Sequence, residues 1–189
     1  PMTLGSLNMD GTEGQGVPAY MEHRYFAHEA MNSMRQIIGK VDEEFAKRCG
    51  RSHGGLIQEY RCEDADVVMV SMGTLAAQVR IVIDELRNEG YKVGAVRLRV
   101  FRTFPTEELR KLGERVKAFA VLDRDISYGS GGAIFTETKA ALYGGRKRPL
   151  LLGFVVGLGG RDVTPSHQRT ILEETMRAVE EGKTTEEER

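Results

Sequence analysis

Residues 150–165 read LLLGFVVGLGGRDVTP, and this stretch decides the fold. The apolar run at 150–156 predicts a strand buried on both faces, as in the centre of a parallel sheet. Thr164 followed by Pro165 is typical of a helix start, with threonine as the N-cap and proline at the first helical position. The glycine-rich segment between them therefore lies at the carboxyl end of a strand, where open α/β sheets tend to meet ligands and partners. The alternative is a turn that serves backbone geometry alone.

The same strand-then-helix pattern recurs upstream of this stretch. Buried strands are predicted at three further places, 66–71, 92–100 and 118–123. Each is followed by a predicted helix: one with its apolar face from Leu75 to Leu86 that stops at Gly90, one capped by Thr106, and one at 130–142. Strands that alternate with helices in this way predict a mostly parallel sheet of four or five strands, covered by helices on both faces. We therefore expect a three-layer α/β/α domain over residues 66–181.

The segments outside this domain have a different composition. Residues 1–19 carry glycines and small polar residues without apolar periodicity, so we expect an extended arm or linker. From Met21, apolar residues recur at steps of three and four, which predicts a long amphipathic helix that ends near Gly50. Residues 20–65 thus form a connector helix and loop, which we expect to pack across neighbouring elements. The charged tail at 182–189 is expected to fray.

The predicted strand at 92–100 differs from the others because apolar residues alternate with Arg97 and Arg99. A central strand of a doubly wound sheet would be apolar on both faces. Either this strand lies at an edge of the sheet with solvated arginines, or a group that attracts positive charge covers its arginine face.

The composition excludes several classes of protein. The net charge of −1 gives no overall basicity that would recruit nucleic acid or an anionic membrane. No apolar stretch approaches the roughly 20 residues of a membrane span, so we expect a cytoplasmic protein. Cys49 and Cys62 are the two cysteines of the chain, and two thiolates cannot build an iron–sulfur or zinc cluster by themselves.

The glycine loops do not carry a nucleotide motif. After Gly157 and Gly159, a dinucleotide fingerprint would need glycine where Asp162 stands, and no P-loop pattern is present. The pair at 73–74 follows a strand and offers one weak candidate for phosphate at a helix start. No serine lies in a G-x-S-x-G elbow, so the pattern does not indicate hydrolase chemistry.

Charged residues gather instead at the predicted strand ends. Since the carboxyl ends of parallel strands meet at one edge of the sheet, these residues should share one rim. A rim of both signs, with neither a nucleophile nor a set of metal ligands, fits a docking surface better than an active site. The interface candidates are Arg97, Arg99, Arg102, Asp123, Arg124, Gly159, Gly160, Arg161 and Asp162.

Four stretches of the chain resemble a known family. They are VVMVSMG at 67–73, RVFRTFP at 99–105, DRDISYG at 123–129 and GLGGRDVTP at 157–165. Together they are similar to the alpha subunit of 2-oxoacid:ferredoxin oxidoreductases, most closely the pyruvate type. One departure is Thr103, where the family usually has proline.

The resemblance implies a fold and a function. The fold would be that of the carboxyl-terminal domain of transketolase, with a five-stranded sheet that has one antiparallel edge strand. The complete enzymes decarboxylate a 2-oxoacid on thiamine diphosphate with Mg²⁺, pass electrons through iron–sulfur clusters to ferredoxin, and release acyl-CoA. None of the family's cofactor-contacting motifs falls in this stretch, so no catalytic, cofactor or metal residue is assigned. This chain would be inactive alone, bind no cofactor, and hold other domains or subunits in register.

Two other hypotheses remain at this point. One is a free-standing small-molecule or nucleotide-binding α/β module that uses 73–74 or the loop 157–164. The other is the corresponding domain of a thiamine-dependent 2-oxoacid dehydrogenase or transketolase relative. Within the rim, Arg102 or Arg124 is a candidate for contact with a phosphate of CoA, on the basis of charge alone.

Overall fold

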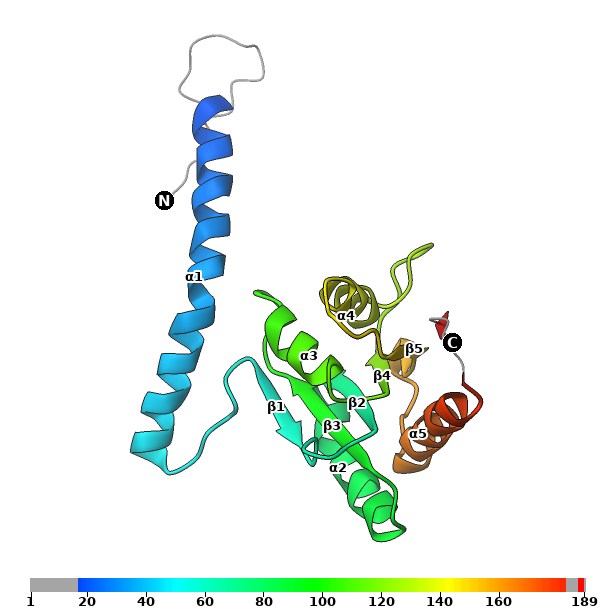
Figure 1. Ribbon diagram of the computed structural model, residues 1–189. Coiled ribbons are helices and arrows are strands. Elements are labelled where there is room, and N and C mark those ends of the chain that lie inside the picture. Colours follow the sequence, from blue (N-terminus) through cyan, green and yellow to red (C-terminus); the bar gives the residue numbers. More distant parts are fainter. Residues whose placement is uncertain (1–16, 183–186, 189) are drawn as a thin grey trace.

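The computed structural model describes residues 17–182 and 187–188, and Figure 1 shows a long helix standing beside an α/β body. The helices are α1 (Val17–Cys49), α2 (Gly73–Asn88), α3 (Thr106–Gly113), α4 (Ala133–Tyr143) and α5 (Pro165–Glu180). The strands are β1 (Ile57–Tyr60), β2 (Val67–Met72), β3 (Val93–Leu98), β4 (Ala118–Asp123), β5 (Leu150–Val155) and β6 (Glu187–Glu188). Residues 1–16 of the predicted arm lie outside the described residues. The last three residues of the predicted arm, 17–19, belong to α1, which begins at Val17.

The sheet has the strand order β1-β3-β2-β4-β5-β6. The strands from β2 to β6 run parallel, and β1 pairs with β3 in the antiparallel direction. The mostly parallel sheet with one antiparallel edge strand is therefore confirmed, and the two-residue strand β6 extends the predicted five strands to six. From β2 the chain passes through α2 to β3 on one side, and then through α3 to β4 on the other side of β2. The strand order thus reverses between β2 and β4.

Two hydrophobic cores hold the three layers together. On one face of the sheet, α2 and α5 pack around Met69, Ile83 and Leu172, which are almost completely buried. On the other face, α3 and α4 pack around Phe119 and Leu112. All six residues of β4 are buried, because helices cover both of its faces. The predicted three-layer α/β/α arrangement is confirmed.

The position of β3 decides between the two explanations of its arginines. It lies between β1 and β2, so the edge hypothesis is wrong for this strand. Arg97 is the next-to-last residue of β3, and Arg99 comes just after its end. The charged residues thus reflect the open carboxyl end of the sheet, and the four-residue strand β1 forms the edge.

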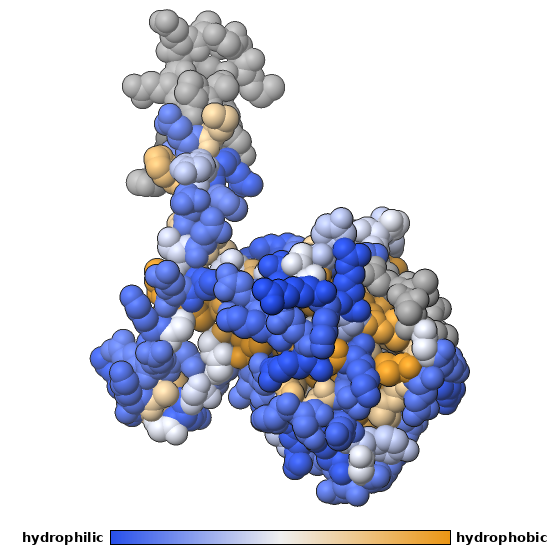
Figure 2. All heavy atoms as spheres, viewed as in Figure 1, coloured by the Kyte–Doolittle hydropathy of each residue, from blue (hydrophilic) through white to orange (hydrophobic). Residues whose placement is uncertain are grey.

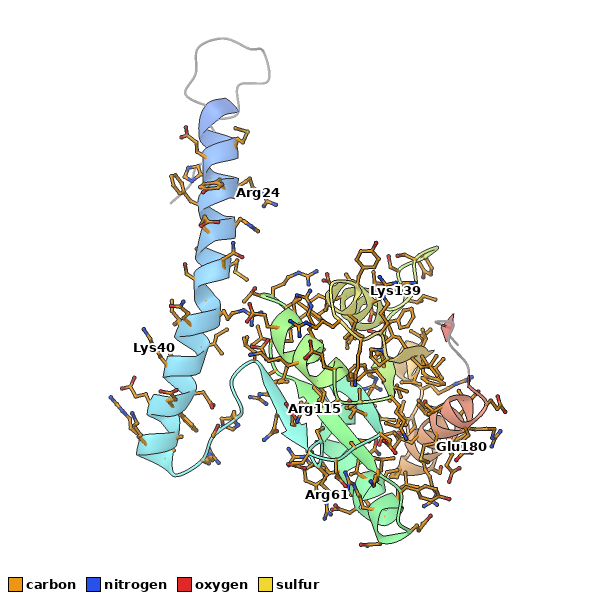
Figure 3. All side chains as sticks on the ribbon, in the orientation of Figure 1. Arg24, Lys40, Arg61, Arg115, Lys139 and Glu180 are labelled. Carbon is orange, nitrogen blue, oxygen red and sulfur yellow. The ribbon has the colours of Figure 1, made fainter. Side chains whose placement is uncertain are left out.

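The long helix predicted from the apolar periodicity is present as α1, but most of its apolar side chains are exposed. Met31, Met34 and Val41 are 40%, 38% and 58% exposed. The body holds this helix mainly through Arg35, whose guanidinium donates to both carboxylate oxygens of Glu108 at 2.8 Å and to the Phe104 carbonyl at 2.9 Å. Figure 3 shows Arg24 and Lys40 on the two halves of α1, and Arg24 lines a hollow together with Arg102 and Glu137 of the body. Other residues of α1 also face the body: His28 and Met31 line the same hollow, of about 590 Å³, together with Phe104.

The expected frayed tail at 182–189 lies mostly outside the described residues, which include 182 and 187–188. Glu187–Glu188 pairs with Leu152 and Gly153 as the short parallel strand β6. The backbone groups on the outer side of β5 have no other strand partner in the described residues, and an unpaired strand edge favours such pairing.

The starts of three helices test the predicted caps. Thr164 is the N-cap of α5 as expected, and a side chain absent from the prediction, His167, completes a capping box: its Nδ1 accepts from the Thr164 N–H at 3.2 Å. In α3, however, Thr106 is the first helical residue and Pro105 precedes it as the cap. No side chain caps α2, which begins at Gly73 with the left-handed φ of 60° that glycine tolerates.

The cap at Thr164 gives a first testable prediction. Thr164→Ala removes the hydroxyl that accepts from the His167 N–H at 3.4 Å, so we expect a loss of about 1 kcal/mol and a melting temperature lower by roughly 2–4 °C. Thermal unfolding followed by circular dichroism measures the change. Thr164→Ser keeps the hydroxyl and should stay within about 1 °C of the parent protein; an equal loss in both variants would contradict the capping role.

Candidate functional site

A hollow lies where the strand order reverses. Its volume is about 730 Å³, and it opens at the carboxyl ends of β2 and β4. This is the place where open α/β sheets characteristically bind ligands. We call it the crossover pocket; its lining residues are Met72, Gly73, Thr74, Leu75, Phe101, Leu122, Arg124, Asp125, Ala133 and Ile134.

Arg124 forms the wall of the crossover pocket nearest to β5. A Cβ atom at Gly157 would lie 2.8 Å from Nε of Arg124, so the arginine lies directly over this glycine. Gly157 has a left-handed φ of 68°, which also favours glycine there. Arg124 is exposed, and its side chain makes no ion pair or hydrogen bond within residues 17–182. Its charge is therefore available to a ligand or partner.

Asp123 does not belong to the exposed rim, although the sequence placed it there. It is 1% exposed, and its carboxylate accepts hydrogen bonds from the backbone N–H groups of Ile134 at 2.8 Å and Phe135 at 2.9 Å. It thus caps α4 from the end of β4. Burial raises the pKa of Asp123 to about 6, against the two hydrogen bonds that lower it, and the neighbouring charge of Asp125 raises it further.

Arg102 is exposed at the rim but already has partners. Its guanidinium pairs with Glu137 of α4 at 2.7 Å and lies over the ring of Phe101, 4.2 Å from the centroid. Arg97 is half-buried between β1 and β2, in register with Gln58 and Ser71, and Arg99 is exposed. Arg97 therefore stands back from the rim.

The glycine loop presents the remaining candidates to solvent. Gly157, Gly159 and Gly160 all adopt left-handed φ values, of 68°, 63° and 80°, so the backbone needs glycine at these positions. The loop holds Arg161 and Asp162 exposed beside a second hollow of about 400 Å³. Neither side chain has an ion-pair partner within residues 17–182.

The sequence analysis missed the apolar residues that are exposed at the carboxyl edge of the sheet. Leu158 is 46% exposed in the glycine loop, and Ile126 is 43% exposed after β4. Tyr128 is 97% exposed on a turn closed by hydrogen bonds between Ser127 and Gly131. Figure 2 shows hydrophilic residues over most of the visible face of the α/β body, with hydrophobic residues visible between them. In the sequence, the only indication of these exposed residues was a single Tyr or Leu within a glycine-rich loop. Whether such a side chain is exposed depends on which elements pack over the loop.

The described residues do not offer a metal centre. Within residues 17–182, no three His, Cys, Asp or Glu side chains stand close enough together to hold a metal ion. Cys49 is exposed at the end of α1, and Cys62 is buried below β1, where burial raises the pKa of its thiol to about 12. No helix in the described part is both long and apolar enough to cross a bilayer.

These features define a class of protein: an α/β/α domain with a crossover pocket and an exposed rim of unpaired charge. Residues 65–168, more than half of the chain, match the family of Pyruvate:ferredoxin oxidoreductase core domain II. The chain belongs to this family. The resemblance of the four sequence stretches is thereby confirmed, in preference to a dehydrogenase or transketolase relative.

Individual relatives agree with this membership. Pyruvate synthase subunit PorA of Pyrococcus furiosus is 44% identical over 184 residues, which are 97% of this chain and 44% of that protein. Ketoisovalerate oxidoreductase subunit VorA of Pyrococcus horikoshii is also 44% identical over 184 residues, 97% of this chain and 45% of that protein. The chain therefore spans less than half the length of these relatives.

A solved structure shares the fold. The 2-oxoglutarate:ferredoxin oxidoreductase from Magnetococcus marinus, with 2-oxoglutarate, coenzyme A and succinyl-CoA bound, superposes with a TM-score of 0.50 and 21% identity. The match covers 62% of this chain and 19% of that one.

Proposed function

We propose that this chain assembles and positions neighbouring domains or subunits in a 2-oxoacid:ferredoxin oxidoreductase. The complete complex would oxidatively decarboxylate a 2-oxoacid to acyl-CoA and reduce ferredoxin. Relatives named for pyruvate and for ketoisovalerate are both 44% identical to the chain, so the proposal extends to the class of 2-oxoacids. The chain itself would contribute contacts and would not carry out the chemical step.

The observation that carries the proposal is the exposed carboxyl edge. Arg124, Arg161 and Asp162 make no ion pair within residues 17–182, and exposed Leu158 and Tyr128 lie on loops of the same edge. Apolar residues surrounded by charges of both signs are typical of the core and rim of a protein interface. An exposed tyrosine on a turn closed by hydrogen bonds is suited to act as an interface anchor.

The cofactors implied for the complete complex do not fit the residues of this chain. A cluster of the ferredoxin type needs four cysteine thiolates, and the chain has two: Cys49 is exposed at the end of α1, and Cys62 is buried after β1. The Mg²⁺ of a thiamine diphosphate site takes oxygen ligands, and the described residues gather no such set. We therefore propose that thiamine diphosphate and the iron–sulfur clusters are held by other parts of the complex, and derive no step through them here.

Substitutions in the glycine loop test the assembly role. Arg161→Ala and Asp162→Ala should each weaken assembly with the co-expressed partner subunits by about tenfold, because a charge of the interface is lost. The melting temperature of the isolated chain should change by less than about 2 °C, since both side chains are exposed. Analytical ultracentrifugation of the complex measures the first quantity, and calorimetry of the chain the second.

Arg146 provides the matched control for this experiment. It is equally exposed, but it lies in the loop before β5, at the opposite edge of the sheet. Arg146→Ala should leave assembly unchanged. Normal assembly of the Arg161 and Asp162 variants would refute the proposed role of the rim.

A further inference from the structure

We propose that the crossover pocket binds a small amphipathic organic anion, with an apolar body on its floor and a single negatively charged group against Arg124. The inference goes beyond the proposed assembly function, because it concerns a small ligand of this chain by itself, although both use the unpaired Arg124. It rests on the shape of the pocket, the chemistry of its lining and the unpaired charge on its wall.

The first step is the position and size of the pocket. The hollow lies between the ends of β2 and β4, where the chain departs in opposite directions and leaves the carboxyl edge uncovered. Its volume of about 730 Å³ falls within the range of roughly 300–1,000 Å³ that is usual for small-molecule sites. A ligand with about ten to fifteen heavy atoms would fit with space to spare.

The second step is the floor, which is apolar and comes from four separate segments. Met72 and Leu75 flank the start of α2, and Phe101 follows β3. Leu122 is the next-to-last residue of β4, and Ile134 is the second residue of α4. Leu75, Leu122 and Ile134 are at most 7% exposed, so the wall is anchored in the cores on both faces of the sheet. The pocket is therefore held by elements of secondary structure and does not depend on one flexible loop.

The third step is the charge. Among the lining residues, Arg124 is the one cation, and it makes no ion pair within residues 17–182. The nearby Arg102 pairs with Glu137 at 2.7 Å and is not available in the same way. An arginine held over Gly157 can form a charge-assisted, two-pronged hydrogen bond with a carboxylate.

The fourth step concerns selectivity. Asp125 lines the same pocket and brings a carboxylate close to any bound anion. Arg124 can pair directly with one carboxylate, while Asp125 cancels the net charge of the lining and repels any further negative charge. The several charges of a nucleotide phosphate chain would therefore be repelled more strongly than a single carboxylate. The lining thus disfavours the nucleotide-binding hypothesis and favours an apolar molecule with one carboxylate.

The test uses a pair of probes that differ in charge. Hydrocinnamate has a phenyl ring and one carboxylate, and hydrocinnamyl alcohol is its neutral analogue. In NMR titrations of the isotope-labelled chain, we expect hydrocinnamate to bind with a Kd of about 1 mM or tighter. The alcohol should bind at least about tenfold more weakly, because it cannot use the charge of Arg124. Shifts should map to Phe101, Leu122 and Ile134.

Variants assign the binding to the pocket. Arg124→Met should reduce the affinity for hydrocinnamate to that for the alcohol, and Arg124→Lys should keep most of it. Arg146→Met applies the same substitution to an exposed arginine outside the pocket and should change nothing. Because Arg124 is exposed, all three variants should retain the parent melting temperature.

Three results would overturn the proposal. They are an absence of binding up to about 10 mM, which is tenfold above the expected Kd, equal affinity for the two probes, and shifts that map to α1 or to the glycine loop. If Arg124→Met proved unstable, a loss of affinity in Arg124→Lys as large as that seen for the neutral probe would also count against the specific role of this side chain.

Discussion

Asp123→Ala is expected to lower the melting temperature by about 5–15 °C, the largest effect of any substitution considered for this chain. The carboxylate accepts from the N–H groups of Ile134 and Phe135, and both of these residues are buried. Alanine leaves the two donors without a partner, and each unsatisfied buried group costs about 1–3 kcal/mol. For a chain of this size, 1 kcal/mol corresponds to roughly 2–4 °C. Differential scanning calorimetry measures the change.

Asp123→Asn is the control variant, because it keeps the shape of the side chain but cannot ionise. Comparing its stability with that of the parent protein at different pH values also tests the raised pKa of Asp123. The asparagine oxygen can accept from one of the two N–H groups, so the loss at pH 7 should be about half that of alanine. The pKa of Asp123 is raised to about 6 from an ordinary value of 3.8, mainly by burial, so the folded protein binds this proton more tightly than the unfolded chain does.

The sign of this effect determines the expected pH profile. The stabilisation from the protonated carboxyl is complete below pH 3.8 and is lost as the pH rises through about 6. The stability difference between the parent and the asparagine variant should therefore be largest near pH 4 and smallest above pH 7. If the stability difference between the two proteins stayed constant over this pH range, the pKa of Asp123 would not be raised in the folded protein.

Gly153→Ala is expected to cost about 1–3 kcal/mol and to lower the melting temperature by about 3–10 °C. Gly153 lies within β5, and a Cβ atom there would stand 2.6 Å from Cδ2 of the Phe135 ring. Both residues lie in a tightly packed core on the α4 face, where overpacking forces the ring or the strand to shift. Chemical denaturation, with a check that the slope is unchanged, measures the loss.

A double mutant separates crowding from other causes. Phe135→Leu leaves room for the new methyl group, so Gly153→Ala should cost about 1 kcal/mol less in this background than in the parent. Gly39 of α1 serves as the comparison, since no atom lies within 4 Å of its added Cβ, and Gly39→Ala should be neutral or slightly stabilising. Strictly additive losses at positions 153 and 135 would contradict the steric explanation.

Much of the fold could be predicted because its signals are local. The buried runs of β2, β4 and β5 and the Thr164–Pro165 helix start were each readable from a few consecutive residues. The site was predicted only in part. Arg124, Arg161 and Asp162 do meet solvent at the carboxyl edge, but Asp123 turned inward, because the N–H groups at the start of α4 need an acceptor. Nothing in the local pattern distinguishes a carboxylate that caps a distant helix from one that faces water.

The sequence by itself determined the order of strands and helices, the family and the glycine loop, since these depend on local backbone preference and on runs of apolar residues. Only the tertiary structure decided that β3 is internal, that the apolar side of α1 stays largely exposed, and that Phe101, Leu122, Arg124 and Ile134 surround one pocket. These features depend on which elements become neighbours. That choice is made by the pairing of strands and the packing of helices far apart in the chain, and no short stretch of residues encodes it.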